Sequence, residues 1–140
     1  MLGLLLLIFE LRQNQDLVRA QIHQARSDAW VSNRFESADS EFLLPAYDKF
    51  IKAGGPLDLT AFDSLNPTES ARITRYAQAL MGDYDNLFYQ FRQGYLDEEY
   101  YRSRVETGIK RWAPIWKKSG LLHTMTPGFL VEVERLTSGD

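Results

Sequence analysis

The stretch Asn66-Pro67-Thr68-Glu69 is the clearest structural signal in this 140-residue chain, because it combines three features of a helix start. Asn66 suits the N-cap, Pro67 suits the first helical position, and Glu69 stands where its side chain completes a capping box. The stretch therefore predicts a long helix that begins here and ends at Gly94.

Apolar residues recur every three or four positions after this start, which is the spacing of a buried helix face. The stripe consists of Ile73, Ala77, Leu80, Tyr84, Leu87 and Phe91, widened by Tyr76, Met81 and Phe88. The acidic run Asp97-Glu98-Glu99 then predicts the start of another helix, since carboxylates are favoured near a helix N-terminus. Its buried face is predicted to be Tyr101, Val105, Ile109 and Trp112. The two helices form a predicted hairpin.

A shorter helix is predicted before the hairpin, capped by Asp39 or Ser40, with Pro45 near its start. Gly54-Gly55-Pro56 ends it, and a turn of helix around residues 60–65 connects it to the hairpin.

After the hairpin, Pro114 is expected to limit the second long helix, and Gly120 to end a short piece that follows. Thr126-Pro127 predicts the start of a last helix. No segment alternates with period two for long enough to form a strand, so the predicted fold class is all-α.

The first residues form an apolar run, Leu2 to Phe9, that stops at Glu10. A membrane-spanning helix needs about 20 apolar residues, and a secretory signal needs flanks that this run lacks. Three interpretations remain: the C-terminal half of a membrane helix, an end that dips into a membrane, or a buried helix end. We favour the first, which makes residues 1–11 a partial membrane anchor and residues 12–140 a single helical domain.

A heptad seam continues the apolar run and predicts one long helix that reaches about Trp30. Its members, at alternating spacings of four and three, are Leu4, Ile8, Leu11, Gln15, Val18, Ile22, Ala25 and Ala29. A stripe of this period packs along a partner helix, and the polar Gln15 within it fixes register. We expect the partner to be the hairpin of the same chain, and self-association through this N-terminal helix is the alternative.

The composition disfavours several functional classes. Lys and Arg total 16 against 19 for Asp and Glu, so the net charge of −3 lacks the basic excess of a nucleic-acid binder. The chain has no cysteine, which excludes disulfides, thiolate zinc sites and cysteine nucleophiles. His23 and His123 lie far apart, and no nucleophile elbow or glycine-rich phosphate loop occurs. We therefore predict no enzyme, no catalytic residue, no cofactor and no metal site.

Two polar groups are candidates for chemistry. The acidic residues Asp83, Asp85 and Asp97 to Glu99 are interpreted as structural, since residues two apart on a helix diverge and the others are explained by capping. Asn86 and Gln90 lie one turn apart beside Tyr89. We expect them to form a hydrogen-bonded pair that fixes packing rather than a binding pocket.

The segment Lys110 to Lys118 holds four cations and two tryptophans and no acid, a composition typical of membrane interfaces. We prefer the interpretation that Trp112 and Trp116 belong to the core and that the cations complement a helix C-terminus.

Gly82 and Gly108 lie equally far from Tyr95 in the turn, so the hairpin helices are expected to approach closely at both glycines, or to admit a large neighbour such as Tyr84 or Trp112. The alternative is that one or both glycines face solvent.

Three blocks, residues 5–14, 65–72 and 85–100, resemble in this order a large group of uncharacterised bacterial proteins. Those proteins have a single N-terminal membrane helix followed by a small all-helical domain. The resemblance covers nearly the whole chain, and it implies placement at the bacterial inner membrane, single-pass or peripheral. It implies no chemistry.

The functional expectation is a membrane-associated helical protein that acts through protein contacts, as a scaffold or an accessory subunit of a membrane assembly. The alternative is a soluble helical ligand-binding or regulatory module with an aromatic pocket around Tyr84, Phe88, Tyr89 and Tyr95.

Overall fold

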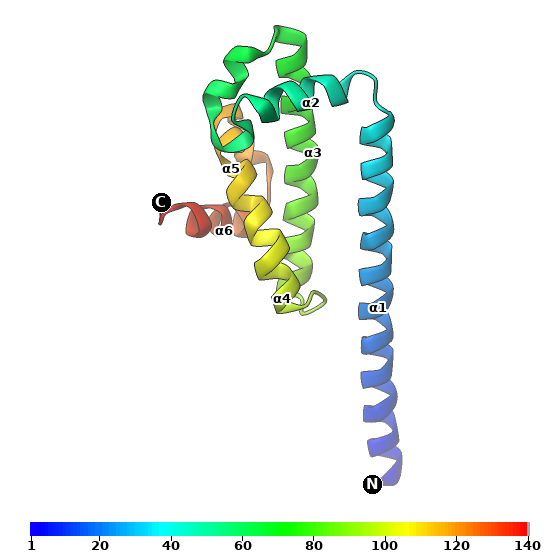
Figure 1. The fold of residues 1–140 in the computed structure, drawn as a ribbon. Helices are drawn as coiled ribbons and strands as arrows, with labels where there is room; N and C mark the ends of the chain where they lie inside the picture. The colour runs from blue at the N-terminus through cyan, green and yellow to red at the C-terminus, as the bar shows by residue number, and fades with distance from the viewer. Residues whose placement is uncertain (140) are drawn as a thin grey trace. The chain divides into compact units, whose positions relative to one another are not determined.

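The described part of the chain is helical throughout, with no β-strand, which confirms the all-α class and the long N-terminal helix (Figure 1). The computed structural model describes the backbone of residues 1–139 and the side chains of these residues except 27, 30, 31, 33–35 and 37–39. The elements are α1 (Leu2–Asp39), α2 (Leu43–Lys52), two 3₁₀ turns (Gly55–Leu57 and Leu59–Ser64), α3 (Pro67–Arg92), α4 (Glu98–Tyr100), a π-helical segment (Tyr101–Glu106), α5 (Thr107–Ser119), a 3₁₀ turn (Leu122–Thr124) and α6 (Pro127–Thr137).

The chain divides into two units, Met1–Glu36 and Ser37–Asp140, whereas the sequence analysis placed the boundary between residues 11 and 12. The first unit is one helix, and α1 continues past the predicted end near Trp30 to Asp39. The prediction ended with the heptad seam, but no glycine or proline follows Gly3 until Pro45, so nothing in the backbone chemistry stops the helix earlier. Packing of this helix on the hairpin stays a prediction.

The hairpin of the second unit begins as predicted. The Asn66 side chain accepts a hydrogen bond from the Glu69 amide at 2.9 Å, and the Glu69 carboxylate accepts one from the Asn66 amide at 2.9 Å. Both bonds of the capping box are therefore present. Gly94, with φ of 74°, turns the chain, and the Asp97 carboxylate accepts from the Tyr100 amide at 2.9 Å to start the return helix.

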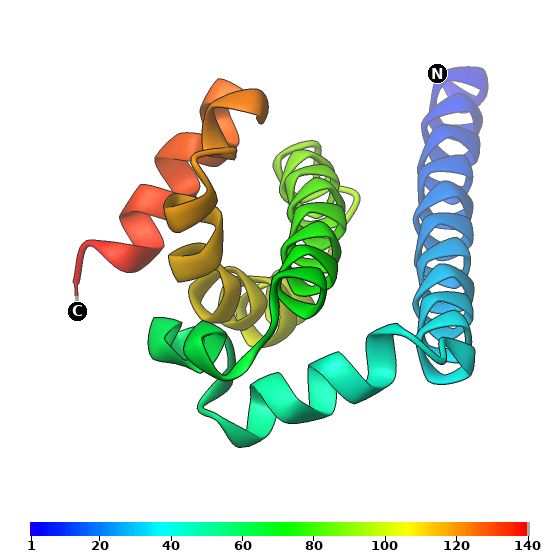
Figure 2. The same cartoon turned by 90° about the horizontal axis from the view of Figure 1, so that it is seen from above.

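The core lies between α3 and α5 and is closed by α2 and α6 (Figure 2). The four residues predicted for the buried face of the return helix are all at most 5% exposed. Trp116 lies at the centre, where its indole N–H donates to the Ala77 carbonyl of α3 at 2.7 Å and its ring packs against Phe129 of α6 at 6.1 Å. Ser40 accepts from the Leu43 amide at 3.0 Å at the start of α2, and the Asp39 side chain lies outside the described residues.

Pro114 does not limit the return helix, contrary to the prediction. It lies inside α5, which continues to Ser119 and ends at Gly120, in the left-handed conformation with φ of 69°. A proline in a helix interior lacks an N–H and costs about 3 kcal/mol. Ala113, Ile115 and Trp116 are each at most 2% exposed. Continuing the helix through Pro114 buries these three side chains, and the free energy gained by their burial outweighs the cost of the proline.

Gly82 and Gly108 do not meet, so that expectation was wrong. Gly82 is exposed, and a Cβ atom there would touch nothing within 4 Å. Gly108 is buried, and a Cβ atom there would overlap the phenol ring of Tyr84 on α3. Gly108 thus makes room for the aromatic ring of Tyr84, which was the second possibility predicted from the sequence.

We predict opposite effects of alanine at the two glycines. Gly82→Ala should stabilise the protein by up to about 1 kcal/mol, because a mid-helix glycine loses more backbone entropy than alanine. Gly108→Ala should destabilise it by about 1–3 kcal/mol, because Tyr84 must leave its place in the core. Urea unfolding followed by circular dichroism measures both. A Gly108→Ala protein as stable as Gly82→Ala would contradict the assigned Tyr84 packing.

Candidate functional site

The first part of α1 is a run of exposed, large apolar side chains. Its large side chains from Leu2 to Phe9 are between 42% and 85% exposed. Soluble proteins seldom expose so much contiguous apolar surface unless it binds something. Among the residues that the structure describes, no helix has both the length and the apolar character to cross a bilayer.

The heptad seam of α1 is also open. Leu11 is 55% and Val18 is 43% exposed, Ala25 and Ala29 are exposed, and Ile22 is half-buried. The long helix therefore presents a continuous apolar face beyond the first residues.

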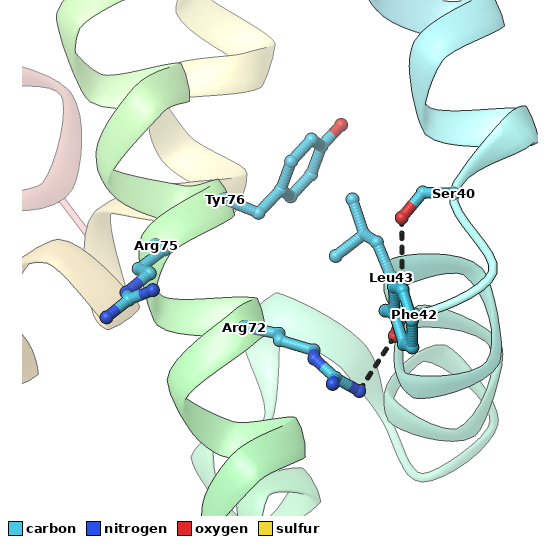
Figure 3. A pocket seen from close by; sticks show the side chains of 6 residues that line it. All are labelled: Ser40, Phe42, Leu43, Arg72, Arg75 and Tyr76. Carbon is cyan, nitrogen blue, oxygen red and sulfur yellow. Dashed lines mark hydrogen bonds between the residues drawn. The ribbon is translucent and has the colours of Figure 1, made fainter.

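Figure 3 shows an open hollow between α2 and α3, with a volume of about 320 Å³. It is lined by Ser40, Phe42, Leu43, Arg72, Arg75 and Tyr76. Arg72 donates to the Phe42 carbonyl at 3.3 Å, and its guanidinium lies 5.0 Å from the centre of the Phe42 ring. Arg75 points away from Phe42 (Figure 3). The two guanidinium groups therefore do not converge on one ligand position.

A second open hollow is lined by Glu98, Glu99, Arg102 and Ser103. Arg102 donates to Glu98 at 2.8 Å, one helical turn away. This geometry is that of a surface ion pair rather than a ligand site, because the charged groups that line the hollow bind each other.

The four aromatic residues of the predicted pocket are not brought together. Tyr84 packs against Trp116 with ring centres 5.8 Å apart, and Phe88 is buried against Phe129 at 6.1 Å. Tyr89 and Tyr95 are 58% and 43% exposed. Phe88 and Tyr89 diverge because adjacent helical residues point about 100° apart, and none of the four lines either hollow.

Two of the acidic candidates, Asp85 and Asp97, are in structural contacts. Asp85 accepts hydrogen bonds from the Thr126 hydroxyl at 2.6 Å and the Thr126 amide at 3.2 Å, which joins α3 to the start of α6. Asp97 caps the return helix, as predicted. Gln90 donates to Asn86 at 3.2 Å, so the predicted hydrogen bond is present. Asn86 is exposed and the Gln90 Oε1 atom is buried with no hydrogen-bond partner among the described residues, so the pair is not the satisfied packing network that was expected.

The histidines occupy separate surroundings. His123 Nδ1 lies 2.6 Å from the Gly120 carbonyl in the turn after α5, and His23 lies on α1. In residues 1–139, as far as their side chains are described, no three acidic or histidine side chains are placed to hold a metal ion.

Both tryptophans of the Lys110 to Lys118 segment belong to the core, which confirms the preferred interpretation of this segment over a membrane interface. Trp112 is 5% and Trp116 is 1% exposed. The cations lie outside: Lys117 pairs with Glu134 at 3.4 Å, and the Lys118 ammonium lies 5.0 Å from the centre of the Phe62 ring.

The sequence analysis missed a buried polar network around Glu132 of α6, which is 9% exposed. Its carboxylate accepts from the Tyr101 hydroxyl at 2.9 Å and from two Arg135 nitrogens at 2.8 and 2.7 Å. Arg135 also donates to Glu106 at 2.9 Å. A signal existed, because Glu132 lies three residues after Phe129 and four before Leu136, within the apolar stripe of its helix.

The bonds from Arg135 hold the pKa of the Glu132 carboxyl below its usual value, and burial raises the pKa of Tyr101 above its own. The network thus keeps an ionised carboxylate fully hydrogen-bonded inside the fold. Because its groups satisfy one another, we interpret it as a structural clamp between the π-helical segment and α6 rather than as a catalytic site.

Comparison with known proteins adds no assignment: no family model, curated protein or solved structure matches the chain. The resemblance to bacterial membrane proteins stays a prediction.

Glu132→Gln should lower the free energy of unfolding by about 1–3 kcal/mol at pH 7, because the charged bonds to Arg135 are weakened. Since the folded pKa of Glu132 is lowered, its contribution is present above the unfolded pKa and is lost as pH falls through the folded value. The difference between wild type and variant should therefore shrink below about pH 4.

Urea unfolding between pH 7 and pH 3 measures this difference. Glu134→Gln is the matched control, because Glu134 lies on the same helix with a side chain that is 69% exposed. A pH-independent gap for Glu132→Gln would contradict the role of the ionised carboxylate.

Proposed function

We propose that this chain is a membrane-associated helical protein that acts through protein contacts, as a scaffold or an accessory subunit of a membrane assembly. The observation that carries the proposal is the exposed apolar surface of Leu2 to Phe9 at the end of α1. Burying a leucine side chain of this kind contributes about 1.5–3 kcal/mol, and seven large apolar residues lie in this segment.

The apolar segment Leu2 to Phe9 is shorter than a helix that spans a bilayer. Eight residues of helix rise about 12 Å, against about 30 Å for the hydrocarbon core of a bilayer. The described apolar segment therefore accounts for about the depth of one leaflet, and Glu10 and Arg12 come to the depth of the headgroups. By the resemblance of its three sequence blocks, we place the protein at the bacterial inner membrane.

The polar groups and hollows described in the second unit support action through protein contacts. The two hollows described above are open, Asp85 and Asp97 bind to neighbouring backbone and side chains, and the buried Glu132 carboxylate is fully bonded. This arrangement stabilises a compact helical body whose exposed surfaces remain to bind partners.

The alternative function, a soluble ligand-binding or regulatory module, is better supported at the hollow of Figure 3 than at the predicted aromatic quartet. Phe42 is 65% exposed there, and the volume of about 320 Å³ falls at the lower end of the range of about 300–1,000 Å³ for ligand pockets.

Flotation with vesicles of phosphatidylcholine and phosphatidylglycerol tests the proposed function. We expect the full chain to float with the vesicles and the double variant Leu5→Asp, Leu6→Asp to remain at the bottom, since a carboxylate is costly in hydrocarbon. Val131→Asp, at a residue of α6 that is 71% exposed, is the matched control and should float like wild type. Wild type that stays with the unbound protein would contradict membrane association.

A further inference from the structure

The seam of α1 has the period of a coiled coil rather than of a helix that packs on a globular surface. Eight positions from Leu4 to Ala29 alternate between spacings of four and three without a break. A straight helix drifts about 20° per heptad from this repeat, so a sustained repeat imposes a left-handed supercoil with a matching helix. The exposed seam residues leave room for such a partner.

The residue types on the seam indicate two strands. Counting the seam as heptad positions, a holds Ile8, Gln15, Ile22 and Ala29, and d holds Leu4, Leu11, Val18 and Ala25, so the isoleucines lie at a and the leucines at d. A β-branched residue at a combined with leucine at d favours a dimer over a trimer or tetramer. The partner is therefore one helix.

Gln15 indicates that the partner helix is a second copy of the same one. It is the single polar residue on the seam and it occupies an a position. In a parallel pair in register, the two a side chains of each layer face each other, so two copies of Gln15 hydrogen-bond across the axis. An apolar helix of another protein would leave this amide buried and unpaired, which costs stability.

The residues that flank the seam indicate the direction. Arg12, Arg19 and Arg26 all occupy the e position. In an antiparallel pair the e positions of both helices lie along the same edge, which brings arginines against arginines. In a parallel pair each e residue lies beside a g residue of the partner, and the g positions hold Leu7, Asn14, Gln21 and Asp28, so no guanidinium group meets another cation.

Attachment of both N-terminal ends to one membrane surface imposes this same direction on two neighbouring copies. We propose that α1 pairs with the α1 of a second copy of this chain as a parallel, in-register, two-stranded coiled coil, which begins at Leu11 near the membrane surface and runs along the seam to Ala29. The parallel orientation of the two copies rests on the proposed function, membrane attachment. The proposal names a second copy of this chain as the first partner of the scaffold.

Single cysteines test the pairing directly, because the natural chain has none. Leu11→Cys and Ala25→Cys are made separately in the full chain, bound to vesicles of phosphatidylcholine and phosphatidylglycerol and oxidised with copper phenanthroline. In a parallel pair each variant should form a disulfide dimer with itself, because equivalent d positions fall within the Cα separation of about 4.4–6.8 Å that a disulfide needs. Leu17→Cys, which is off the seam and on the same helix, is the matched control and should react at least tenfold more slowly.

Leu11→Cys and Ala25→Cys proteins that do not form disulfide dimers with themselves would overturn the parallel arrangement. Dimers at Leu17→Cys as fast as at the seam would show random collision and overturn the pairing. Adding Ile22→Asp to Leu11→Cys should reduce the disulfide dimer at least tenfold, whereas Leu17→Asp should leave it unchanged. Thermal unfolding of each variant checks that residues 37–140 remain folded.

Flotation of the same samples separates this inference from the proposed function. Protein that floats without forming a seam disulfide retains membrane association and overturns the pairing. Protein that forms no seam disulfide and loses flotation with Ile22→Asp has its seam on lipid, which also overturns the pairing. Protein that does not float at all contradicts the proposed function, whatever disulfides it forms, and overturns a coiled coil that starts at the membrane.

Discussion

The buried indole of Trp116 is the constraint on which the second unit depends. Its N–H donates to a carbonyl of α3, and its ring contacts Tyr84 on α3 and Phe129 on α6. The bond fixes the indole of α5 to the backbone of α3. Because Gly108 has no side chain, the Tyr84 ring fits against α5 at this position. One side chain thus determines how three helices meet, and the missing side chain of a glycine makes that arrangement fit.

The two units use their apolar residues differently. In the second unit, aromatic and aliphatic side chains close around Trp116, and the polar groups near the core bind one another, as around Glu132. In α1, apolar side chains of similar size are exposed along the helix. An isolated helix gains little stability from its own backbone bonds, and most helices depend on packing of an apolar face. The proposed contacts of α1 with lipid and with a second copy would provide that packing.

Local signals predicted the elements, and long-range contacts account for the errors. The capping box at Asn66 and the cap at Asp97 depend only on neighbouring residues, so both were found. Pro114 was predicted to end the helix because proline is unfavourable in a helix interior. The burial of Ala113, Ile115 and Trp116 keeps the helix continuous through it. For the candidate site, the exposed end of α1 was visible as a run of leucines. Glu132 stood out in the sequence only as an acid within an apolar stripe, and its network was not predicted, because its partner Tyr101 belongs to a segment 31 residues earlier that only the folded chain brings to it.

The contact of Asp85 with Thr126 has a consequence for the order of folding. A helix usually receives the cap of its first amides from a residue next to it in sequence. At the start of α6, the Thr126 hydroxyl and amide donate to a carboxylate 41 residues earlier in the chain, on α3. With 11 residues, α6 is below the length at which helices persist alone in water. We infer that α6 orders late, in the same step in which it docks, and that α3 serves as its template.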